Sequence, residues 1–189
     1  MYRVVVVDDE VLIHMYVREI LENNGYEVVG VAEDGLDAIN VCREQRPDFV
    51  IMDIRIPVLS GLEATKMIIE EKLAGFVIML TACRDRNIAQ KAVDIGAMGY
   101  IVKPVCEDSL LPAVEIAINE YKRFQAMEKE VIKAKESLDD RKFVDRAKGI
   151  LMERKKMTEN EAYTYLRKLA MDKEKSIGEV SKILIKAFG

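Results

Sequence analysis

The sequence predicts a doubly wound α/β domain with a five-stranded parallel sheet, followed by a long helix and a small all-helical unit. Two observations predict the sheet. Short apolar runs alternate with helical patterns over residues 1–118, and the run Val4–Val7 is apolar at every position, as in strands covered by helices on both faces. A third observation predicts the long helix, because the chain has neither Gly nor Pro between residue 113 and Gly149.

The elements of the α/β domain follow from the apolar runs and from helix-end signals. Asn24-Gly25 closes the first helix with a residue suited to positive φ, and Ser60 with Glu63 forms a capping box that opens the third helix. We expect strands near residues 3–7, 27–32, 48–53, 76–81 and 99–103. We expect helices near residues 11–24, 36–45, 61–73, 85–96 and from 108 onward.

Composition excludes a membrane-spanning or disulfide-built protein. No apolar stretch approaches the roughly 18–20 residues needed to cross a bilayer, and the N-terminus enters a strand without a charged-then-apolar leader. The three cysteines, Cys42, Cys83 and Cys106, are an odd number without metal-like spacing, which suits a reducing compartment. We therefore expect a cytoplasmic globular protein with no membrane partner, and a redox role of Cys83 and Cys106 stays open.

Charge is distributed unevenly along the chain. Residues 139–189 carry 13 Lys/Arg against 9 Asp/Glu, a net charge of +4, whereas residues 1–138 carry 16 against 24, a net charge of −8. The acidic front and basic tail indicate that only the tail meets a polyanion.

The long helix carries an apolar repeat that we call the seam. Its members recur at heptad positions and are Ala117, Phe124, Met127, Val131, Ala134 and Leu138. About three heptads are near the minimum for a coiled coil, so we expect a coiled-coil linker over residues 119–138 that associates with a second copy, the alternative being that it packs on its own chain. Whether the helix continues through Ser137–Asp140 stays open.

Two further capping boxes mark the tail, residues 139–189, as a three-helix unit. They are Thr158 with Glu161 and Ser176 with Glu179. The inner faces predicted from apolar spacing are Phe143, Ala147, Ile150 and Leu151, then Ala162, Leu166 and Leu169, then Ile177, Val180 and Leu184.

Reactive side chains end four of the predicted strands. Asp8 and Asp9, Asp53, Thr81 and Lys103 follow or close apolar runs. Because the carboxyl ends of parallel strands meet at one edge of the sheet, these side chains should gather there. Three crowded carboxylates repel one another unless a cation intervenes, and Mg²⁺ prefers such oxygen ligands. A hydroxyl and an ammonium beside them predict phosphoryl transfer to a carboxylate.

With these residues in this order, residues 1–118 resemble the receiver domain of two-component response regulators. The resemblance implies that Asp53 is the phosphoacceptor, and that Asp8, Asp9, Asp53 and the backbone carbonyl of Arg55 bind Mg²⁺. It also implies that Lys103 binds phosphate, that Thr81 and Tyr100 form the switch pair, and that a sensor histidine kinase donates the phosphoryl group. The one histidine, His14, is interpreted as a surface residue of the first helix.

The tail resembles an ANTAR domain, the RNA-binding module of transcription antitermination regulators. The resemblance rests on Arg146–Arg154, which contains Ala-Lys-Gly-Ile-Leu-Met, and on Thr158, Glu161–Tyr163, Leu166-Arg167 and Ala170-Met171. The candidate RNA-binding residues are Arg141, Lys148, Arg154, Lys155, Tyr163, Arg167 and Lys168. Gly149 inside a helix suggests the close approach of another helix or of a nucleic-acid backbone.

The sequence therefore predicts a response regulator, phosphorylated on Asp53, that dimerises and binds hairpin RNA in mRNA leaders to prevent transcription termination. Two rivals remain. A DNA-binding response regulator would need a recognition helix rich in Arg, Asn or Gln, whereas the last helix offers the cations Lys182 and Lys186. A phosphatase would usually place a second acid two residues after its nucleophile, where this chain has Arg55. We therefore do not expect an enzyme beyond its own phosphotransfer and dephosphorylation.

Overall fold

The computed structural model describes residues 1–82 and 86–188, except for the side chains of residues 86–89, 134 and 136. Cys83 and the seam side chain of Ala134 thus lie outside the described residues. The chain divides into two compact units, Met1–Phe124 and Gln125–Gly189. Among the described helices, none is both long and apolar enough to cross a bilayer.

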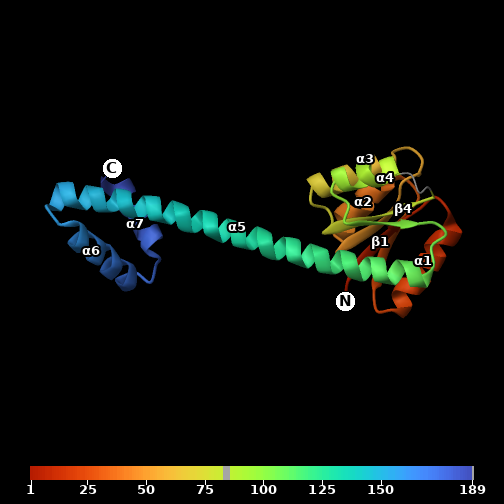
Figure 1. The fold of residues 1–189 in the computed structure, drawn as a ribbon, viewed down its shortest axis with the longest axis horizontal. Helices are drawn as coiled ribbons and strands as arrows, with labels where there is room; N and C mark the ends of the chain where they lie inside the picture. Colours follow the sequence, from red (N-terminus) through yellow and green to blue (C-terminus); the bar gives the residue numbers. More distant parts are fainter. Residues whose placement is uncertain (83–85, 189) are drawn as a thin grey trace. The chain divides into compact units, whose positions relative to one another are not determined.

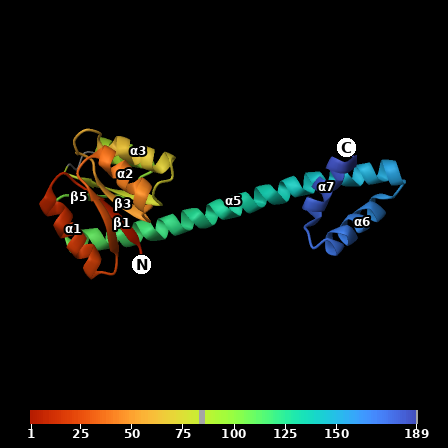
Figure 2. The ribbon, with the colours of Figure 1, turned by 180° about the vertical axis from the view of Figure 1, so that it is seen from behind.

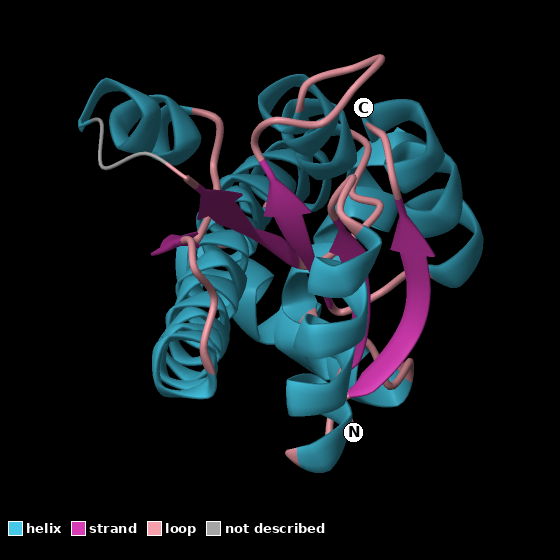
Figure 3. Cartoon of the chain, turned by 90° about the vertical axis from the view of Figure 1, so that its right-hand side faces the viewer, coloured by secondary structure: helices cyan, strands magenta, loops and turns pink. Residues whose placement is uncertain are grey.

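The first unit is built on the predicted parallel sheet. Its strands are β1 (Arg3–Val7), β2 (Glu27–Ala32), β3 (Phe49–Asp53), β4 (Phe76–Thr81) and β5 (Gly99–Val102). They pair in the order β2-β1-β3-β4-β5, and every neighbouring pair is parallel. The doubly wound α/β fold is confirmed, and Figure 3 shows the strands between helices on both sides.

Each face of the sheet is covered by its own set of helices (Figures 1 and 2). On one face pack α1 (Val11–Asn23) and the start of α5 (Glu107–Lys155). On the other pack α2 (Gly35–Gln45), α3 (Gly61–Glu70) and α4 (Arg86–Asp94). Because both faces are buried, β1, β3 and β4 are apolar almost throughout, and the polar side chains that end β3 and β4 stand out.

Two local signals in this unit behave as the sequence predicts. Gly25 has a φ of 82°, which ends α1 in the left-handed region. The capping box of Ser60 and Glu63 opens α3. The helix also needs glycine at its first position, because a Cβ on Gly61 would lie only 1.9 Å from the backbone oxygen of Asp53. Gly61 therefore lets α3 start directly against the end of β3.

The long helix is continuous through Ser137–Asp140, which answers the question that the sequence left open. The seam needs one correction. Ala117 is 1% exposed and lies in the core beside α1, so it does not face outward. The exposed seam starts at Phe124 and includes Met127, Val131 and Leu138, which are 52%, 59%, 65% and 63% exposed.

The second unit packs the end of α5 with α6 (Glu159–Asp172) and α7 (Ile177–Phe188) around one small core. The predicted inner residues Ala147, Leu151, Ala162, Leu166, Val180 and Leu184 are buried, and Ile150, Leu169 and Ile177 pack partly buried beside them. The expectation that Phe143 belongs to the inner face is wrong. Its side chain is half-buried next to Lys182, whose Nζ is 4.8 Å from the ring centroid.

Both predicted capping boxes of the tail are present. Thr158 caps α6 with Glu161, and Ser176 exchanges equivalent hydrogen bonds with Glu179 at the start of α7. Of the two approaches considered at Gly149, that of another helix is absent, since a Cβ there would meet no atom outside its own helical turn within 4 Å among the described residues. The tight contact instead involves Gly178, where a Cβ would lie 2.1 Å from the carboxyl carbon of Asp140.

Candidate functional site

An acidic pocket lies at the carboxyl edge of the sheet in the first unit. Asp8 directly follows β1, and Asp53 is the last residue of β3, the neighbouring strand. One carboxylate oxygen from each of Asp8, Asp9 and Asp53 lies within 4.8 Å of the other two. Asp8 and Asp53 are buried, whereas Asp9 is exposed. The three acids that the sequence placed at this edge are thus gathered in one cluster.

Lys103 closes the pocket from the loop after β5. Its Nζ lies 2.7 Å from Oδ2 of Asp8 and 2.5 Å from Oδ2 of Asp53, and its side chain is only 13% exposed. The Lys103-Pro104 peptide bond is cis. The lysine therefore sits between the two buried carboxylates, as expected from its position at the end of a strand.

Backbone amides hold the other oxygens of these two acids. The N–H of Glu10 donates to Oδ1 of Asp8, and the N–H of Arg55 donates to Oδ1 of Asp53, each over 3.1 Å. Because each carboxylate has one oxygen fixed by an amide and the other beside the ammonium, its orientation is set before any ligand arrives. Such preorganisation reduces the free-energy cost of binding a cation or a transferred phosphoryl group.

The charges in the pocket are only partly balanced. Burial raises the pKa of Asp8 above its usual 3.8, and the nearby Lys103 ammonium offsets part of this effect. Burial by itself would lower the pKa of Lys103, but its contacts with Asp53 and Asp8 outweigh burial, and the net shift is upward. The pocket thus contains three acidic side chains and one lysine, so acidic groups outnumber basic ones.

The residues present fit a divalent cation. Oδ2 of Asp8 is the one buried side-chain oxygen or nitrogen in the described part of the chain without a partner in hydrogen-bond geometry, although the ammonium lies close to it. Together with Asp9 and Asp53 it offers a set of hard oxygen ligands at the mouth of the pocket. Mg²⁺ takes one or two carboxylates and keeps its remaining positions for water and phosphate oxygens.

The two residues of the predicted switch pair lie on the adjacent strands. Thr81 ends β4 and is 5% exposed, and its backbone oxygen accepts a hydrogen bond of 2.8 Å from the N–H of Lys103. Tyr100 pairs with Met79 across β4 and β5, but its side chain is 51% exposed. Thr81 is therefore next to the pocket in the sheet, whereas Tyr100 has its ring largely in solvent.

His14 is a residue of the site that sequence reasoning missed. It was expected on the surface of the first helix, yet it is 6% exposed, and its Nε2 accepts a hydrogen bond of 3.1 Å from the N–H of Asp8. Its spacing from Val17 and Leu21, which are both buried, was the available signal, because residues three and seven apart share a helix face. His14 thus lies beneath the acid pair rather than on the outside of α1.

The candidate RNA-binding residues of the second unit differ in their exposure to solvent and in whether they already contact other side chains. Arg141, Arg154, Arg167 and Lys168 are exposed. Lys148 is 16% exposed and lies 2.8 Å from both Asp145 and Glu159, and these contacts raise its pKa. Lys155 donates a hydrogen bond of 3.1 Å to the hydroxyl of Tyr165. The sequence did not reveal these partners, which come from neighbouring turns and from α6.

Three of the candidates line one cavity of about 500 Å³ between the end of α5, α6 and the start of α7. They are Arg141, Lys148 and Tyr163. The same cavity contains the carboxylates of Asp140 and Asp145, so its charge is mixed. The structure therefore brings these residues together without making the cavity a simple anion site.

A parallel sheet of this order, with three acids and a lysine at its carboxyl edge, defines a receiver domain, and comparison with known proteins agrees. The family model of the response regulator receiver domain matches residues 4–115, and that of the ANTAR domain matches residues 133–185. The chain belongs to the response regulators of two-component systems, and it combines a receiver domain with an ANTAR domain.

Relatives match either the whole chain or its first unit. The transcriptional regulatory protein PdtaR of Mycobacterium tuberculosis is 38% identical over 187 residues, which cover 99% of this chain and 91% of that protein. The chemotaxis protein CheY of Bacillus subtilis is 36% identical over 118 residues, covering 62% of this chain and 98% of CheY. A solved receiver domain of a modulated diguanylate cyclase from Desulfovibrio desulfuricans G20 is 31% identical, with a TM-score of 0.59. The match covers 65% of this chain and 97% of that domain's chain.

Proposed function

We propose that this response regulator accepts a phosphoryl group on Asp53 from a sensor histidine kinase and then binds hairpin RNA in mRNA leaders to prevent transcription termination. The observation that carries the proposal is the position of Asp53, buried between a lysine and two further acids in a chain that also contains an ANTAR domain. Beyond its own phosphorylation and dephosphorylation, we propose no enzymatic activity.

Asp8, Asp9, Asp53 and the carbonyl of Arg55 would hold Mg²⁺, which supplies positive charge to the oxygens of the transferred group when it is bound. The chain's own residues do the rest. A carboxylate oxygen of Asp53 attacks the phosphorus atom, and the phosphorus–nitrogen bond to the kinase's histidine breaks on the opposite side, so that the imidazole leaves in line. Lys103 turns its ammonium from the carboxylate oxygen to a phosphoryl oxygen. The amide of Arg55 keeps the carboxylate oriented through Oδ1.

Phosphorylation adds roughly 1.5–2 negative charges to a pocket that is already acidic. Thr81, at the end of the neighbouring strand, binds the new oxygens, and the exposed ring of Tyr100 turns into the space that Thr81 leaves. This change alters the nearby helix faces and favours a homodimer through the exposed seam from Phe124 to Leu138. A seam of large apolar side chains in solvent supports association with a second copy.

RNA binding would use the basic tail. Arg141, Arg154, Arg167 and Lys168 are exposed cations that attract phosphates without reading sequence. Lys148, Lys155 and Tyr163 remain predicted contacts, although both lysines would first have to leave their present partners. Two tails in one dimer can grip two hairpins, and linking two weak sites raises affinity by roughly 10²–10⁴.

The test measures RNA binding and dimerisation with and without a phosphodonor. Acetyl phosphate and Mg²⁺ should increase both in the native chain and neither in Asp53→Asn, while Asp37→Asn, which alters an exposed acid on α2, should respond like the native chain. An Asp53→Asn chain that still dimerised and bound hairpin RNA upon phosphodonor addition would reject the gating.

The seam needs its own pair of variants. Val131→Glu places a charge on the seam and should abolish the dimer, whereas Ile132→Glu changes a neighbour of similar exposure, 50% against 65%, that does not belong to the heptad repeat. Analytical ultracentrifugation of the phosphorylated chains compares them. Dimers of equal strength in both variants would exclude the seam as the interface.

The DNA-binding alternative is tested in the same assay, with labelled duplex DNA competing against hairpin RNA. On α7, Lys182 already pairs with Asp140 at 3.0 Å, which leaves the helix with little free positive charge for a groove of DNA. RNA should therefore displace DNA, and the reverse order would favour the alternative.

A further inference from the structure

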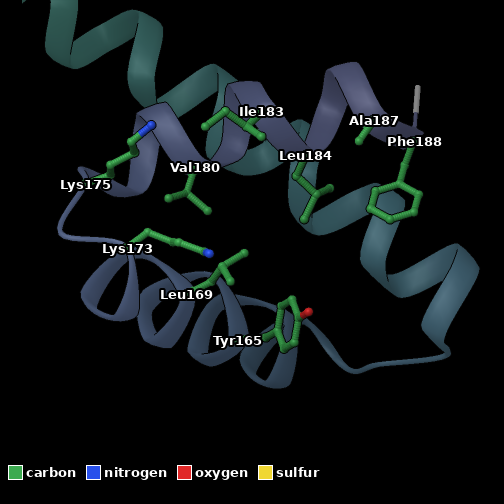
Figure 4. Close-up of a pocket in the computed structure, with 9 residues that line it drawn as sticks. All are labelled: Tyr165, Leu169, Lys173, Lys175, Val180, Ile183, Leu184, Ala187 and Phe188. Atoms are coloured by element: carbon green, nitrogen blue, oxygen red, sulfur yellow. The ribbon is translucent and has the colours of Figure 1, made fainter.

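An apolar groove lies between α6 and α7 in the second unit. It has a volume of about 220 Å³ and is lined by Tyr165, Leu169, Lys173, Lys175, Val180, Ile183, Leu184, Ala187 and Phe188 (Figure 4). Leu184 and Val180 form part of the core below, while Ile183 and Phe188 are 52% and 46% exposed. Large apolar side chains thus line a groove that is open to solvent.

The two ends of the groove differ in chemistry. Figure 4 shows the rings of Tyr165 and Phe188 toward one end, and Lys173 and Lys175 toward the other. No carboxylate belongs to the residues that line it. The groove therefore offers flat aromatic surfaces at one end and positive charge at the other, in contrast to the mixed charge of the cavity beside Arg141.

A cationic side chain from the end of α5 lies close to each of the two aromatic rings. Nζ of Lys155 lies 4.2 Å from the ring centroid of Tyr165, and the guanidinium of Arg154 lies 5.7 Å from that of Phe188. Each cation adds positive charge next to its ring. An occupant with an aromatic ring and an anionic group would meet both features at once.

We infer that this groove holds one unstacked nucleotide of an RNA strand, with its base against Tyr165 and Phe188 and its phosphate beside Lys173 and Lys175. The inference rests on the proposed RNA binding and names the subsite for a single base. Specific RNA recognition takes bases out of loops and stacks them on aromatic side chains, and lysines bind the backbone. A partner protein's apolar helix would make no use of the cations at the rim, whereas the phosphate of a nucleotide complements their charge.

The test uses a hairpin RNA selected from a pool with a randomised loop for binding to the full phosphodonor-treated chain. Phe188→Ala and Ile183→Glu change exposed groove residues, the latter by placing a carboxylate beside the phosphate. Phe188→Ala should weaken binding roughly 5- to 150-fold, which corresponds to the about 1–3 kcal/mol of one stacked base. Ile183→Glu should also weaken binding, through repulsion between its carboxylate and the phosphate. Met171→Ala is the control, because Met171 is 73% exposed on α6 but does not line the groove.

Base removal then locates the contact. Loop nucleotides are replaced one at a time by abasic ones, and at one position the loss caused by Phe188→Ala should disappear, because the ring no longer has a base to stack on. Lys173→Ala should lower the slope of log affinity against log salt by about 0.7, the value for one phosphate contact on a single strand. Circular dichroism checks that each variant keeps its helices.

The outcomes separate this inference from the proposed function. If the selection yields no RNA that binds the native chain, RNA binding itself fails, and the nucleotide site fails with it. If RNA binds and both groove variants keep native affinity, the groove inference alone is overturned. The same conclusion follows if, at every loop position, the affinity lost in a groove variant simply adds to the affinity lost on removing the base. Groove variants that change the oligomeric state but not RNA affinity would also overturn it, since the groove would then be a protein interface.

Discussion

Nε2 of His14 accepts a hydrogen bond from the backbone N–H of Asp8 over 3.1 Å, and this bond connects the first turn of α1 to the first acid of the pocket. Accepting at Nε2 places the imidazole proton on Nδ1. The same N–H also reaches the backbone oxygen of Ala32 at 3.1 Å, so Asp8 is held from both β2 and α1. The buried imidazole thus helps to fix the loop on which two of the three acids stand.

We expect His14→Ala to lower the free energy of unfolding by about 1–3 kcal/mol, because it removes a buried side chain and the acceptor of a buried hydrogen bond. His14→Gln, whose amide oxygen can accept the same bond, should lose less. Urea denaturation compares the three chains. Equal midpoints for His14→Ala and the native chain would show that this contact contributes nothing.

Lys103 should compete with Mg²⁺ for the same carboxylates. Its Nζ lies within 2.7 Å of both Asp8 and Asp53, so replacing it by an apolar side chain removes the competing cation and leaves two like charges together. We expect Lys103→Met to melt at a lower temperature than the native chain without metal and to gain more stability from Mg²⁺.

Thermal melts with and without MgCl₂ measure this difference, and Lys66→Met, which removes an exposed lysine, provides the control. A Mg²⁺-induced shift that is the same in Lys103→Met and the native chain would mean that the lysine and the metal do not share a site.

Two glycines should respond to alanine in opposite ways. Gly61→Ala would bring a Cβ to 1.9 Å from the backbone oxygen of Asp53, so α3 must move and stability should fall. Gly149→Ala places its methyl group in open space within a helix, where alanine is favoured by about 1 kcal/mol. Denaturant unfolding of both variants tests the pair, and a destabilised Gly149→Ala would imply a contact that the described residues do not contain.

The capping box of α6 should make the second unit sensitive to acid. Hydrogen bonds from the backbone N–H and the hydroxyl of Thr158 lower the pKa of Glu161 below its usual 4.5. Because the folded pKa is the lower one, the carboxylate's contribution to stability is complete above about pH 4.5 and is lost as the pH falls through the folded value.

Hydrogen exchange at the Thr158 amide, which donates to Oε2 of Glu161 over 2.8 Å, follows this loss between neutral and acidic pH. Glu161→Gln should show a flatter pH dependence over that range. Identical profiles for the two chains would argue that the charge of Glu161 has no part in the cap.

The sequence predicts features whose cause is local, and it fails where burial depends on a distant partner. Ser60 and Thr158 cap helices through residues three positions away, and Asp53 ends an apolar run, so spacing suffices to place them. His14 and Ala117 were misplaced because a helical pattern does not say which side meets another element. Lys148 was likewise interpreted as a free cation, because its partner Glu159 belongs to a different helix, α6, and the sequence does not show that the two lie side by side.

The central claim is that Asp53 accepts a phosphoryl group in a pocket that requires a divalent cation, and mass spectrometry of the full chain treated with acetyl phosphate tests it most directly. We expect the mass of one phosphoryl group on the peptide that contains Asp53, present with MgCl₂, absent with a chelator and absent in Asp53→Asn. A phosphoryl group found on another residue, or on Asp53 in equal amount without any divalent cation, would contradict the account.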